Sequence, residues 1–421
     1  MSLAVDFCGI HFDNPFFVAS QVSVSRVDPQ GMADLLRRHV DAGAGAVCTP
    51  CILSLPGSDG SRMQPARRMI AARGRPPFHQ IGLFGLALNV KNLCNRDFGL
   101  ELLYRLRGIG VPIIANVMGG SADPATWASI AREMVAEGAN MLELDTSCPL
   151  SAGEFDGDGE FPRAPGFLVG QVPSLLREIT RAVKKAVDVP VMVKMTPEIG
   201  YPQLIHVAQG IRDAGADAIS AINAPVSIAP PDLRTRGRSA YPFTKRFNFS
   251  AAFGPWDRFL MYKFVAAISL HVRIPVSAVG GILDPEHAVE AMLLGARTVQ
   301  FSSGILWRGV KLIRHSKSFL QRYLEEQEFG SVEELVGASH RYIGEVEYDD
   351  FARAYPLLEE NKCTLCGICA ETTCMALSIT GQRLVLDKAL CTGCNLCVVN
   401  CPTDAWQLAR AADEAPVGSA T

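Results

Sequence analysis

Two runs of cysteine near the end of the chain carry the most specific chemistry in the sequence. Three thiolates spaced two residues apart bind one face of a [4Fe–4S] cluster, and the cysteine that trails each triplet completes the cluster of the other run. The first run is Cys363-x2-Cys366-x2-Cys369-x4-Cys374, and the second is Cys391-x2-Cys394-x2-Cys397-x3-Cys401-Pro402. The predicted ligand sets are Cys363, Cys366, Cys369 and Cys401 for one cluster, and Cys374, Cys391, Cys394 and Cys397 for the other. Such clusters transfer single electrons.

Zinc is the alternative ligand of a cysteine-rich segment. Zinc ribbons use two C-x2-C pairs rather than two triplets that each have a trailing cysteine, so the pattern favours iron–sulfur clusters. The first run is irregular, because four residues precede its last cysteine where three are usual, and Met375 stands where a proline is common. We predict two [4Fe–4S] clusters.

The composition narrows the class of protein that carries this segment. Eight of the 13 cysteines are in it and the other five lie before residue 149, which excludes a disulfide-stapled secreted domain. The 40 basic and 43 acidic residues leave a net charge of −3, so neither nucleic acid nor a membrane is an expected partner. The N-terminus lacks a signal-peptide pattern, and no apolar stretch is long enough to span a bilayer. We expect a cytoplasmic protein.

Residues 1–310 alternate short strand patterns with longer helical ones. The strand candidates are continuous apolar runs, as expected for parallel strands buried on both faces. They are Phe16–Ala19, Ala46–Thr49, Ile113–Asn116, Met141–Asp145, Val191–Lys194, Ala218–Ile222, Val276–Val279 and Thr298–Phe301. Eight β/α steps predict a (β/α)8 barrel, an α/β fold. A doubly wound sheet is the alternative, but no G-x-G-x-x-G follows the first strand.

The rest of the chain divides into three shorter parts. Residues 311–355 are predicted to form a helical connection that leaves the barrel. Residues 356–410 hold both cysteine runs and are predicted to form a ferredoxin-like domain with the two clusters. The small, polar residues 411–421 are expected to be a disordered tail.

The loops after the seventh and eighth predicted strands have the small residues of a phosphate-binding site. Gly280 and Gly281 follow the seventh strand, and Ser302 and Ser303 follow the eighth. Backbone N–H groups of these two loops bind phosphate in many barrels of this type. A flavin is the usual converter between one-electron clusters and two-electron chemistry. We therefore predict that these four residues bind the phosphate of a flavin.

Further motifs resemble those of a known family. They are Asn14-Pro15-Phe16 with Ala19-Ser20, the stretch Leu142-Glu143-Leu144-Asp145-Thr146-Ser147-Cys148-Pro149, Val193-Lys194-Met195-Thr196-Pro197, Asn223, and Gly280-Gly281. In this order, and followed by a two-cluster segment, they resemble the C-terminal half of the dihydropyrimidine dehydrogenases and, more broadly, the dihydroorotate dehydrogenase-like FMN barrels. The resemblance covers nearly the whole chain. It implies FMN in the barrel mouth, with its ring between substrate and clusters.

The resemblance also implies roles for single residues. Lys194 would lie beside the N1–C2=O edge of the flavin and stabilise its anionic reduced form. We favour this role over a structural one, because an unpaired buried lysine is costly. By the same resemblance, Asn89 and Asn116 would line the pocket near flavin and substrate, Asn223 would face the substrate, and Ala19 and Ser20 would approach the flavin through backbone groups.

Two departures from the family pattern put the substrate in question. The loop after the fourth strand has Val169 where the family has a cysteine or serine that exchanges a proton with the substrate, and an isopropyl group cannot do this chemistry. Asp145 stands where the family often has asparagine. Asp145, His79 and Tyr241 are the candidate proton donors, whereas Cys148 belongs to the strand-end turn and is expected to be structural.

Three hypotheses follow for the activity. The first is an iron–sulfur flavoprotein oxidoreductase that passes electrons between two [4Fe–4S] clusters and FMN to reduce or oxidise an activated carbon–carbon bond of a small, non-pyrimidine substrate. Because the chain has no dinucleotide fingerprint, a ferredoxin or an NAD(P)H-oxidising flavoprotein subunit is the expected electron partner. The second is an electron-transfer subunit with no substrate of its own. The third is a dihydropyrimidine or dihydroorotate dehydrogenase with a displaced proton donor. Barrels of this type often form homo-oligomers, which is an analogy only.

Overall fold

The computed structural model describes ten segments of the chain. They are residues 2–20, 28–54, 69–72, 82–85, 94–148, 169–201, 203–228, 230–239, 249–345 and 355–408. Four sequence predictions fall outside them, namely those for His79, Asn89, Tyr241 and the tail 411–421.

Eight parallel strands form a closed barrel. They pair in chain order, the last strand pairs with the first, and every one of them is buried. The strands are β3 (Phe16–Val18), β4 (Ala46–Cys48), β9 (Ile113–Met118), β10 (Met141–Asp145), β11 (Val191–Lys194), β12 (Ala218–Ala221), β17 (Val276–Val279) and β18 (Thr298–Phe301). The predicted (β/α)8 barrel is confirmed, and the alternative of an open doubly wound sheet is wrong because β18 pairs with β3.

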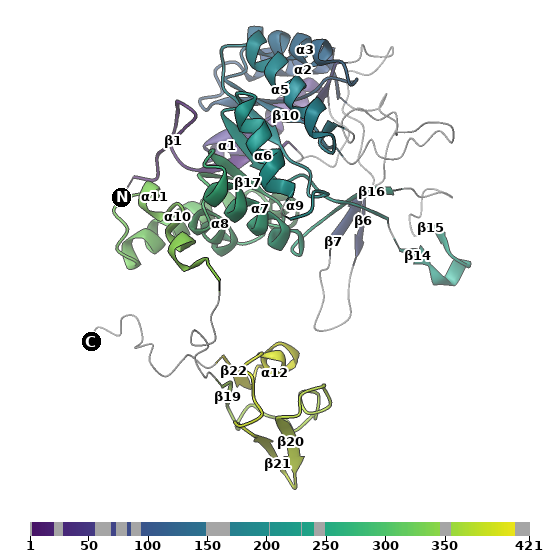
Figure 1. Ribbon diagram of the computed structural model, residues 1–421, viewed down its shortest axis with the longest axis vertical. Coiled ribbons are helices and arrows are strands. Elements are labelled where there is room, and N and C mark those ends of the chain that lie inside the picture. Colours follow the sequence, from purple (N-terminus) through teal and green to yellow (C-terminus); the bar gives the residue numbers. More distant parts are fainter. Residues whose placement is uncertain are drawn as a thin grey trace. The chain divides into compact units, whose positions relative to one another are not determined.

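Helices surround this barrel (Figure 1). They are α1 (Pro29–Asp41), α2 (Arg96–Leu106), α3 (Pro124–Ala136), α5 (Pro173–Ala186), α6 (Gln203–Asp213), α7 (Asp257–His271), α8 (Pro285–Leu293), α9 (Ser303–Arg308) and α10 (Lys311–Glu326). The side chain of Asp28 caps α1, that of Asn95 caps α2, and that of Asp123 caps α3, each by accepting a hydrogen bond from a backbone N–H of the first turn. These caps start each helix directly after the loop that leaves a strand.

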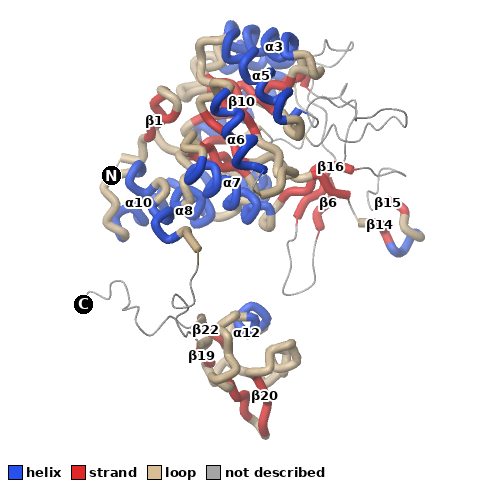
Figure 2. Tube along the Cα trace, viewed as in Figure 1, coloured by secondary structure: helices blue, strands red, loops and turns tan. Residues whose placement is uncertain are grey.

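Several short strands extend the mouth of the barrel. The pair β5 (Ile52–Leu53) and β8 (Cys94–Asn95) adds to β9. A separate four-stranded antiparallel sheet (Figure 2) consists of β13 (Val226–Ile228), β16 (Phe249–Phe253), β7 (Gly82–Gly85) and β6 (Met69–Ala72). A small hairpin, β14 (Pro231–Asp232) and β15 (Arg238–Ser239), encloses the 3-10 turn η3 (Leu233–Thr235). Because β13 follows β12 and β16 precedes α7, the antiparallel sheet belongs to the connections at the carboxyl ends of the barrel strands.

The opposite end and the exit of the barrel are closed by local elements. The hairpin β1 (Val5–Phe7) and β2 (Ile10–Phe12) contributes Phe7 and Phe12 to the core. After α10, the short helix α11 (Val332–Leu335) and the 3-10 helix η4 (Ala338–Tyr342) complete the compact unit of the barrel, which extends to Tyr342. Among the described residues, no helix is long and apolar enough to cross a membrane.

A second compact unit holds the two cysteine runs. Its elements are β19 (Leu357–Leu358), β20 (Leu377–Thr380), β21 (Arg383–Leu386), α12 (Leu396–Asn400) and β22 (Trp406–Gln407). The first strand pairs with the last, and β20 pairs with β21. The small core contains Cys369, Leu377, Cys397 and Trp406, so two of the cysteines are themselves part of it.

Asp257 is an unusual acid in the fold of the barrel. It opens α7, is only 2% exposed, and its Oδ1 has no hydrogen-bond partner among the described residues. Burial raises the pKa of this carboxyl to about 8. The folded protein therefore holds a proton on Asp257 at pH values at which the unfolded chain has released it.

This pKa predicts a pH-dependent stability that Asp257→Asn removes. Between about pH 4 and pH 8 the folded state binds one proton more than the unfolded state at this position, so stability decreases as pH rises. We expect the difference in unfolding free energy between D257N and the native protein, measured by urea denaturation, to shift in favour of D257N by about 1–3 kcal/mol from pH 5 to pH 8. The exposed Asp41 provides the control, and D41N is expected to show no such trend. A difference between D257N and the native protein that is constant with pH would contradict the assignment.

Candidate active site

A buried cluster of polar side chains lies inside the barrel around Glu143. The Glu143 carboxylate accepts hydrogen bonds from Lys194 Nζ (3.3 Å), Asn116 Nδ2 (2.6 Å) and Gln300 Nε2 (2.9 Å). Gln300 Nε2 also lies within hydrogen-bond distance of Ser220 Oγ (3.1 Å) and Ser277 Oγ (3.2 Å). These side chains come from β9, β10, β11, β12, β17 and β18, and only closure of the barrel brings them together.

The charges in this cluster stabilise one another. Burial alone would raise the pKa of Glu143, but the ammonium of Lys194 and the donated hydrogen bonds lower it below its usual value. Burial works to lower the pKa of Lys194, but the carboxylates of Glu143 and Asp145 raise it above its usual value. The argument from sequence treated Lys194 as unpaired, and that premise is wrong, because Glu143 is its partner in an ion pair that is almost completely removed from water.

Buried Asp145 and half-buried Asn223 form a second pair. Asn223 Nδ2 donates to Asp145 Oδ1 (2.8 Å) and lies 3.2 Å from Ser147 Oγ. Asn223 Oδ1 accepts the backbone N–H of Ala224 (2.9 Å). Burial, opposed by the charge of Lys194, raises the pKa of Asp145. The carboxyl group is therefore better able to hold a proton than an exposed aspartate, and the Asn223 amide is already engaged by it.

Val169 lies fully buried at the place where a proton-exchanging residue is expected. The backbone N–H of Gly170 donates to the Thr146 carbonyl (2.7 Å), which ties this segment to the turn that follows β10. Cys148, in the same turn, is also buried, and burial generally makes a thiol unreactive. The described part of this loop thus offers an aliphatic side chain and no acid or base of its own.

The two predicted phosphate-binding loops lie in contact. Gly280 and Gly281 both have positive φ, +134° and +63°. A Cβ on Gly281 would lie 2.3 Å from the backbone N of Arg258, and a Cβ on Gly304 would lie 2.3 Å from the carbonyl oxygen of Ile282. Ser303 is buried at the start of α9, after Ser302. Only glycine fits at Gly281 and Gly304, because the loops after β17 and β18 approach each other and α7 through their backbones.

Some of the remaining residues predicted to contact the flavin are described by the structure, and others are not. The backbone N–H of Ala19 donates to the Phe301 carbonyl (3.0 Å), which brings the end of β3 beside the end of β18. Ser20 Oγ, Asn116 Oδ1 and Gln300 Oε1 are buried and have no hydrogen-bond partner among the described residues. Asn89, His79 and Tyr241 lie outside the described residues. Unpartnered buried polar atoms are uncommon in proteins, and these three stand on β9, on β18 and just after β3.

The cysteine unit has a pocket that matches one predicted ligand set. Cys363, Cys366, Cys369 and Cys401 all line it, together with Trp406. The backbone N–H of Ala405 donates to Cys401 Sγ (3.2 Å). Cys374 and Cys397 contact the same small core, and Cys391 and Cys394 are half-buried and exposed, respectively. Among the described residues, no three His, Cys, Asp or Glu side chains converge as the ligands of a single metal ion do, whereas the ligands of a cluster stand further apart.

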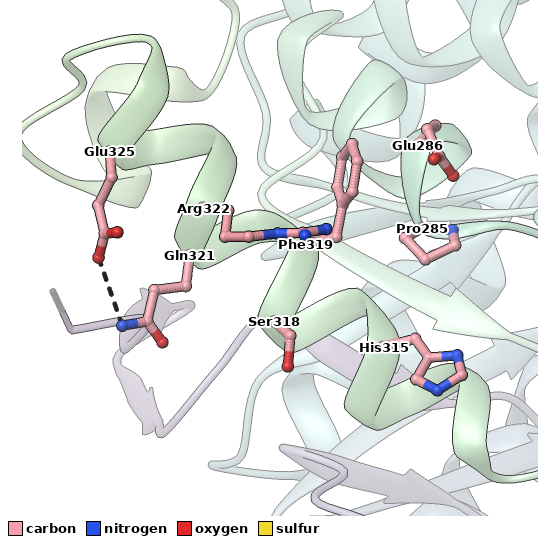
Figure 3. A pocket seen from close by; sticks show the side chains of 8 residues that line it. All are labelled: Pro285, Glu286, His315, Ser318, Phe319, Gln321, Arg322 and Glu325. Carbon is pink, nitrogen blue, oxygen red and sulfur yellow. Dashed lines mark hydrogen bonds between the residues drawn. The ribbon is translucent and has the colours of Figure 1, made fainter.

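A further hollow lies on the outside of the barrel unit, beside α8 and α10 (Figure 3). It is lined by Pro285, Glu286, His315, Ser318, Phe319, Gln321, Arg322 and Glu325. Gln321 Nε2 lies 3.4 Å from Glu325 Oε1, and Arg322 is balanced by two acidic residues. None of the predicted site residues lines this hollow, and it presents no predominant charge.

Comparison with known proteins identifies the barrel. Residues 2–324 match the family described as dihydroorotate dehydrogenase, and residues 384–407 match the 4Fe-4S binding domain. The chain belongs to the dihydroorotate dehydrogenase family. It is 30% identical over 385 residues to the NAD-dependent dihydropyrimidine dehydrogenase subunit PreA of Escherichia coli K12, covering 87% of this chain and 84% of the relative. It is also 30% identical over 344 residues to the catalytic subunit of dihydroorotate dehydrogenase B (NAD(+)) of Methanocaldococcus jannaschii, covering 80% of this chain and 98% of the relative.

Membership of the dihydroorotate dehydrogenase family confirms the predicted enzyme class. The protein is an iron–sulfur flavoprotein and belongs to the FMN-dependent oxidoreductases that act on CH–CH groups. Its C-terminal unit has a 4Fe-4S motif. The matched 4Fe-4S segment contains Cys391, Cys394, Cys397 and Cys401. The first cysteine run lies outside that match.

Glu143 and Gln300, the side chains on which the buried cluster depends, are not among the residues predicted from the sequence for the site. Both stand within apolar strand patterns, Leu142-Glu143-Leu144 and Val299-Gln300-Phe301. A polar residue in the middle of a strand that is buried on both faces must find a partner inside the barrel, and this was the available signal. The Asp145–Asn223 bond joins residues 78 positions apart and left no such local sign.

The contact of the two loops predicts that Gly281→Ala weakens FMN binding. The added methyl group would meet backbone atoms of Arg258 and Gly254, so the loop after β17 must move. We expect G281A to retain less than about a tenth of the FMN of the native protein after gel filtration, measured by absorbance of the released flavin. In contrast, Gly138 also has a positive φ but would place a Cβ with nothing within 4 Å, so Gly138→Ala should lower stability by about 1 kcal/mol and keep its FMN. Equal FMN content in G281A and G138A would rule out the loop as part of the flavin site.

Proposed function

We propose that this protein is a two-cluster, FMN-dependent oxidoreductase that reduces or oxidises an activated carbon–carbon bond of a small, non-pyrimidine substrate. Two observations together carry the proposal. Lys194 and Glu143 form a buried ion pair on the side where the flavin is expected. On the proton-exchanging side, Val169 and Asp145 stand in place of the residues of the family pattern. The family relationship supports FMN and one 4Fe-4S motif. The second cluster, the substrate and the partner are the proposed extensions.

The residues at the barrel mouth fit FMN. The loops of Gly280 and Gly304 meet backbone to backbone and leave no room for side chains there, as a phosphate-binding loop requires. Ser20, Asn116 and Gln300 each have a buried polar atom without a partner among the described residues. Lys194 supplies a positive charge at the end of β11. These groups would hold the phosphate and the polar edges of the flavin.

When bound, FMN supplies hydride exchange with the substrate and one-electron exchange with the clusters. Lys194 then acts as a fixed positive charge beside the cofactor. We propose Asp145 as the proton-exchanging group, because its buried carboxyl ends β10 beside Lys194 in strand register and its pKa is raised. For reduction of a C=C bond, Asp145 would give its proton to the carbon that does not receive the hydride.

A second candidate function has its own supporting observation. Asn223, which the family resemblance assigns to the substrate, donates both to Asp145 and toward Ser147, and Val169 has no acid–base function. Both facts favour an electron-transfer subunit that passes electrons to a partner without a substrate of its own. The third hypothesis, dihydropyrimidine or dihydroorotate oxidation with a displaced donor, is retained only through the names of the relatives.

The electron partner is proposed to be a ferredoxin or an NAD(P)H-oxidising flavoprotein subunit. The chain has no dinucleotide fingerprint after its first strand, whereas its relatives are named as subunits of NAD-dependent enzymes. The predicted thiolate ligands and the remaining cysteines suit a reducing compartment such as the cytoplasm. The small net charge of −3 fits a protein without nucleic-acid partners.

The activity is tested by offering electron acceptors to the reduced protein. We expect anaerobically reduced protein to be reoxidised by an activated enone at least 100-fold faster than by uracil, as followed by flavin absorbance and by the saturated product. Asp145→Asn should lower the rate of the enone reaction by about 10²–10⁴-fold and keep its FMN. Val169→Cys should change the rate with uracil and leave the rate with the enone as it is. Rapid oxidation by ferredoxin, with neither carbon acceptor reduced, would establish the electron-transfer subunit instead.

The ligand sets predict how pairs of cysteine substitutions combine. Cys363 and Cys401 line one pocket, so C363S and C401S should each lose one cluster, and the double variant should lose no more than either alone. C363S combined with C374S should lose both clusters. Starting from about eight iron atoms per chain in the native protein, iron analysis of the anaerobically purified variants should give about four atoms for C363S/C401S and almost none for C363S/C374S. The reverse pattern would assign each run to its own cluster.

A further inference from the structure

We propose that Glu143 is a positioning residue that keeps Lys194 protonated and holds its ammonium group at the flavin. The inference deepens the proposed function and rests on FMN binding at the barrel mouth. Glu143 does not need to touch the cofactor for this role, since it acts through Lys194.

The geometry makes Glu143 the common acceptor of the cluster. It is 0% exposed, and its two oxygens accept from Lys194, Asn116 and Gln300. Asn116 comes from the strand on one side of β10 and Lys194 from the strand on the other side, while Gln300 reaches it from β18. Three donors from three directions hold the carboxylate in place, and the carboxylate in turn fixes the position of the Lys194 ammonium.

The titratable groups that face Lys194 come from two elements. On β10 they are Glu143, in direct contact, and Asp145, which pairs with Lys194 in strand register and is hydrogen-bonded to Asn223. On β4 the group is Cys48, whose thiol lies 3.9 Å from Glu143 Oε1. The neighbouring strands β12 and β17 present the hydroxyls of Ser220 and Ser277. Glu143 is therefore the one described carboxylate in contact with Lys194 Nζ.

Removal of the Glu143 charge should make Lys194 titrate. In the native protein, burial favours neutral Lys194, and the carboxylates overcome this effect. With glutamine at position 143 the shape of the site is kept, but the desolvation of Lys194 is offset only by the more distant groups. Lys194 would then lose its proton as pH rises, and the positive charge beside the flavin would be present at low pH and absent at high pH.

The test is the FMN reduction potential as a function of pH, measured by anaerobic spectroscopic titration of Glu143→Gln, Lys194→Met and the double variant. We expect E143Q to have a higher potential than the native protein at low pH, because an uncompensated positive charge stabilises the reduced flavin. Its potential should then fall through an additional inflection between about pH 7 and pH 10 that is absent from the native curve. K194M and E143Q/K194M should lack this inflection, since they have no lysine to titrate.

A matched control breaks another lysine–carboxylate pair of the same barrel. Lys184 Nζ lies 2.6 Å from Asp217 Oδ2, which also accepts the backbone N–H of Val191 at the start of β11. This pair is at the opposite end of β11 from Lys194. Asp217→Asn should lower stability and leave the potential unchanged at every pH, so a general loss of packing cannot imitate the expected result.

The outcomes separate the inference from the proposed function. Native protein without FMN would overturn the proposed function itself. An E143Q protein that binds FMN and follows the native potential at every pH would overturn the role of Glu143 alone. If E143Q does not fold, Glu143→Asp is measured in its place. The carboxylate is retained but withdrawn by one methylene, so it compensates Lys194 less well, and the inflection should appear at lower pH than lysine deprotonation in the native protein. A potential curve identical to the native one would overturn the inference.

Discussion

The barrel interior is organised by the cost of removing a carboxylate and an ammonium group from water. A buried ion pair is tolerated only when its geometry is good and its remaining hydrogen-bonding capacity is filled. Glu143 and Lys194 meet both conditions, since Asn116 and Gln300 supply further donors and the serines of β12 and β17 surround Gln300. Each of these donors stands on a different strand, so the ion pair and the closure of the barrel depend on each other. An open sheet would leave the pair unsatisfied.

This constraint acts on one side of the site. Replacing Lys194 or Glu143 by a neutral residue would leave the other buried charge without its partner, which costs stability. Val169 and Asp145 lie outside this ion pair. Val169 fills apolar space, and Asp145 is hydrogen-bonded to Asn223. The flavin-side residues can therefore persist for reasons of stability, and their presence alone does not identify a substrate.

The strands of the barrel could be predicted from the sequence because each is a continuous apolar run that must be buried on both faces. The polar cluster could not, because its members are single residues within those runs, and their meeting depends on strands that are far apart in the chain. Glu143 and Gln300 are separated by 157 positions. Residues 249–253 form β16 because they find strand partners in β13 and β7. Pairing of this kind depends on a register that no local pattern specifies.

Asp145 decides between the two leading functions because one carboxyl group cannot serve both arrangements at once. Bonded to Asn223, it engages the amide that the family resemblance assigns to the substrate. In its protonated form it would be the acid that the proposed carbon chemistry requires. Burial favours the protonated form, whereas the nearby ammonium of Lys194 favours the ionised one. Because Glu143 already compensates Lys194, the second effect is reduced, and the buried ion pair thereby helps to keep a proton on Asp145. The proposed role of Asp145 as the acid thus depends on how completely Glu143 neutralises Lys194.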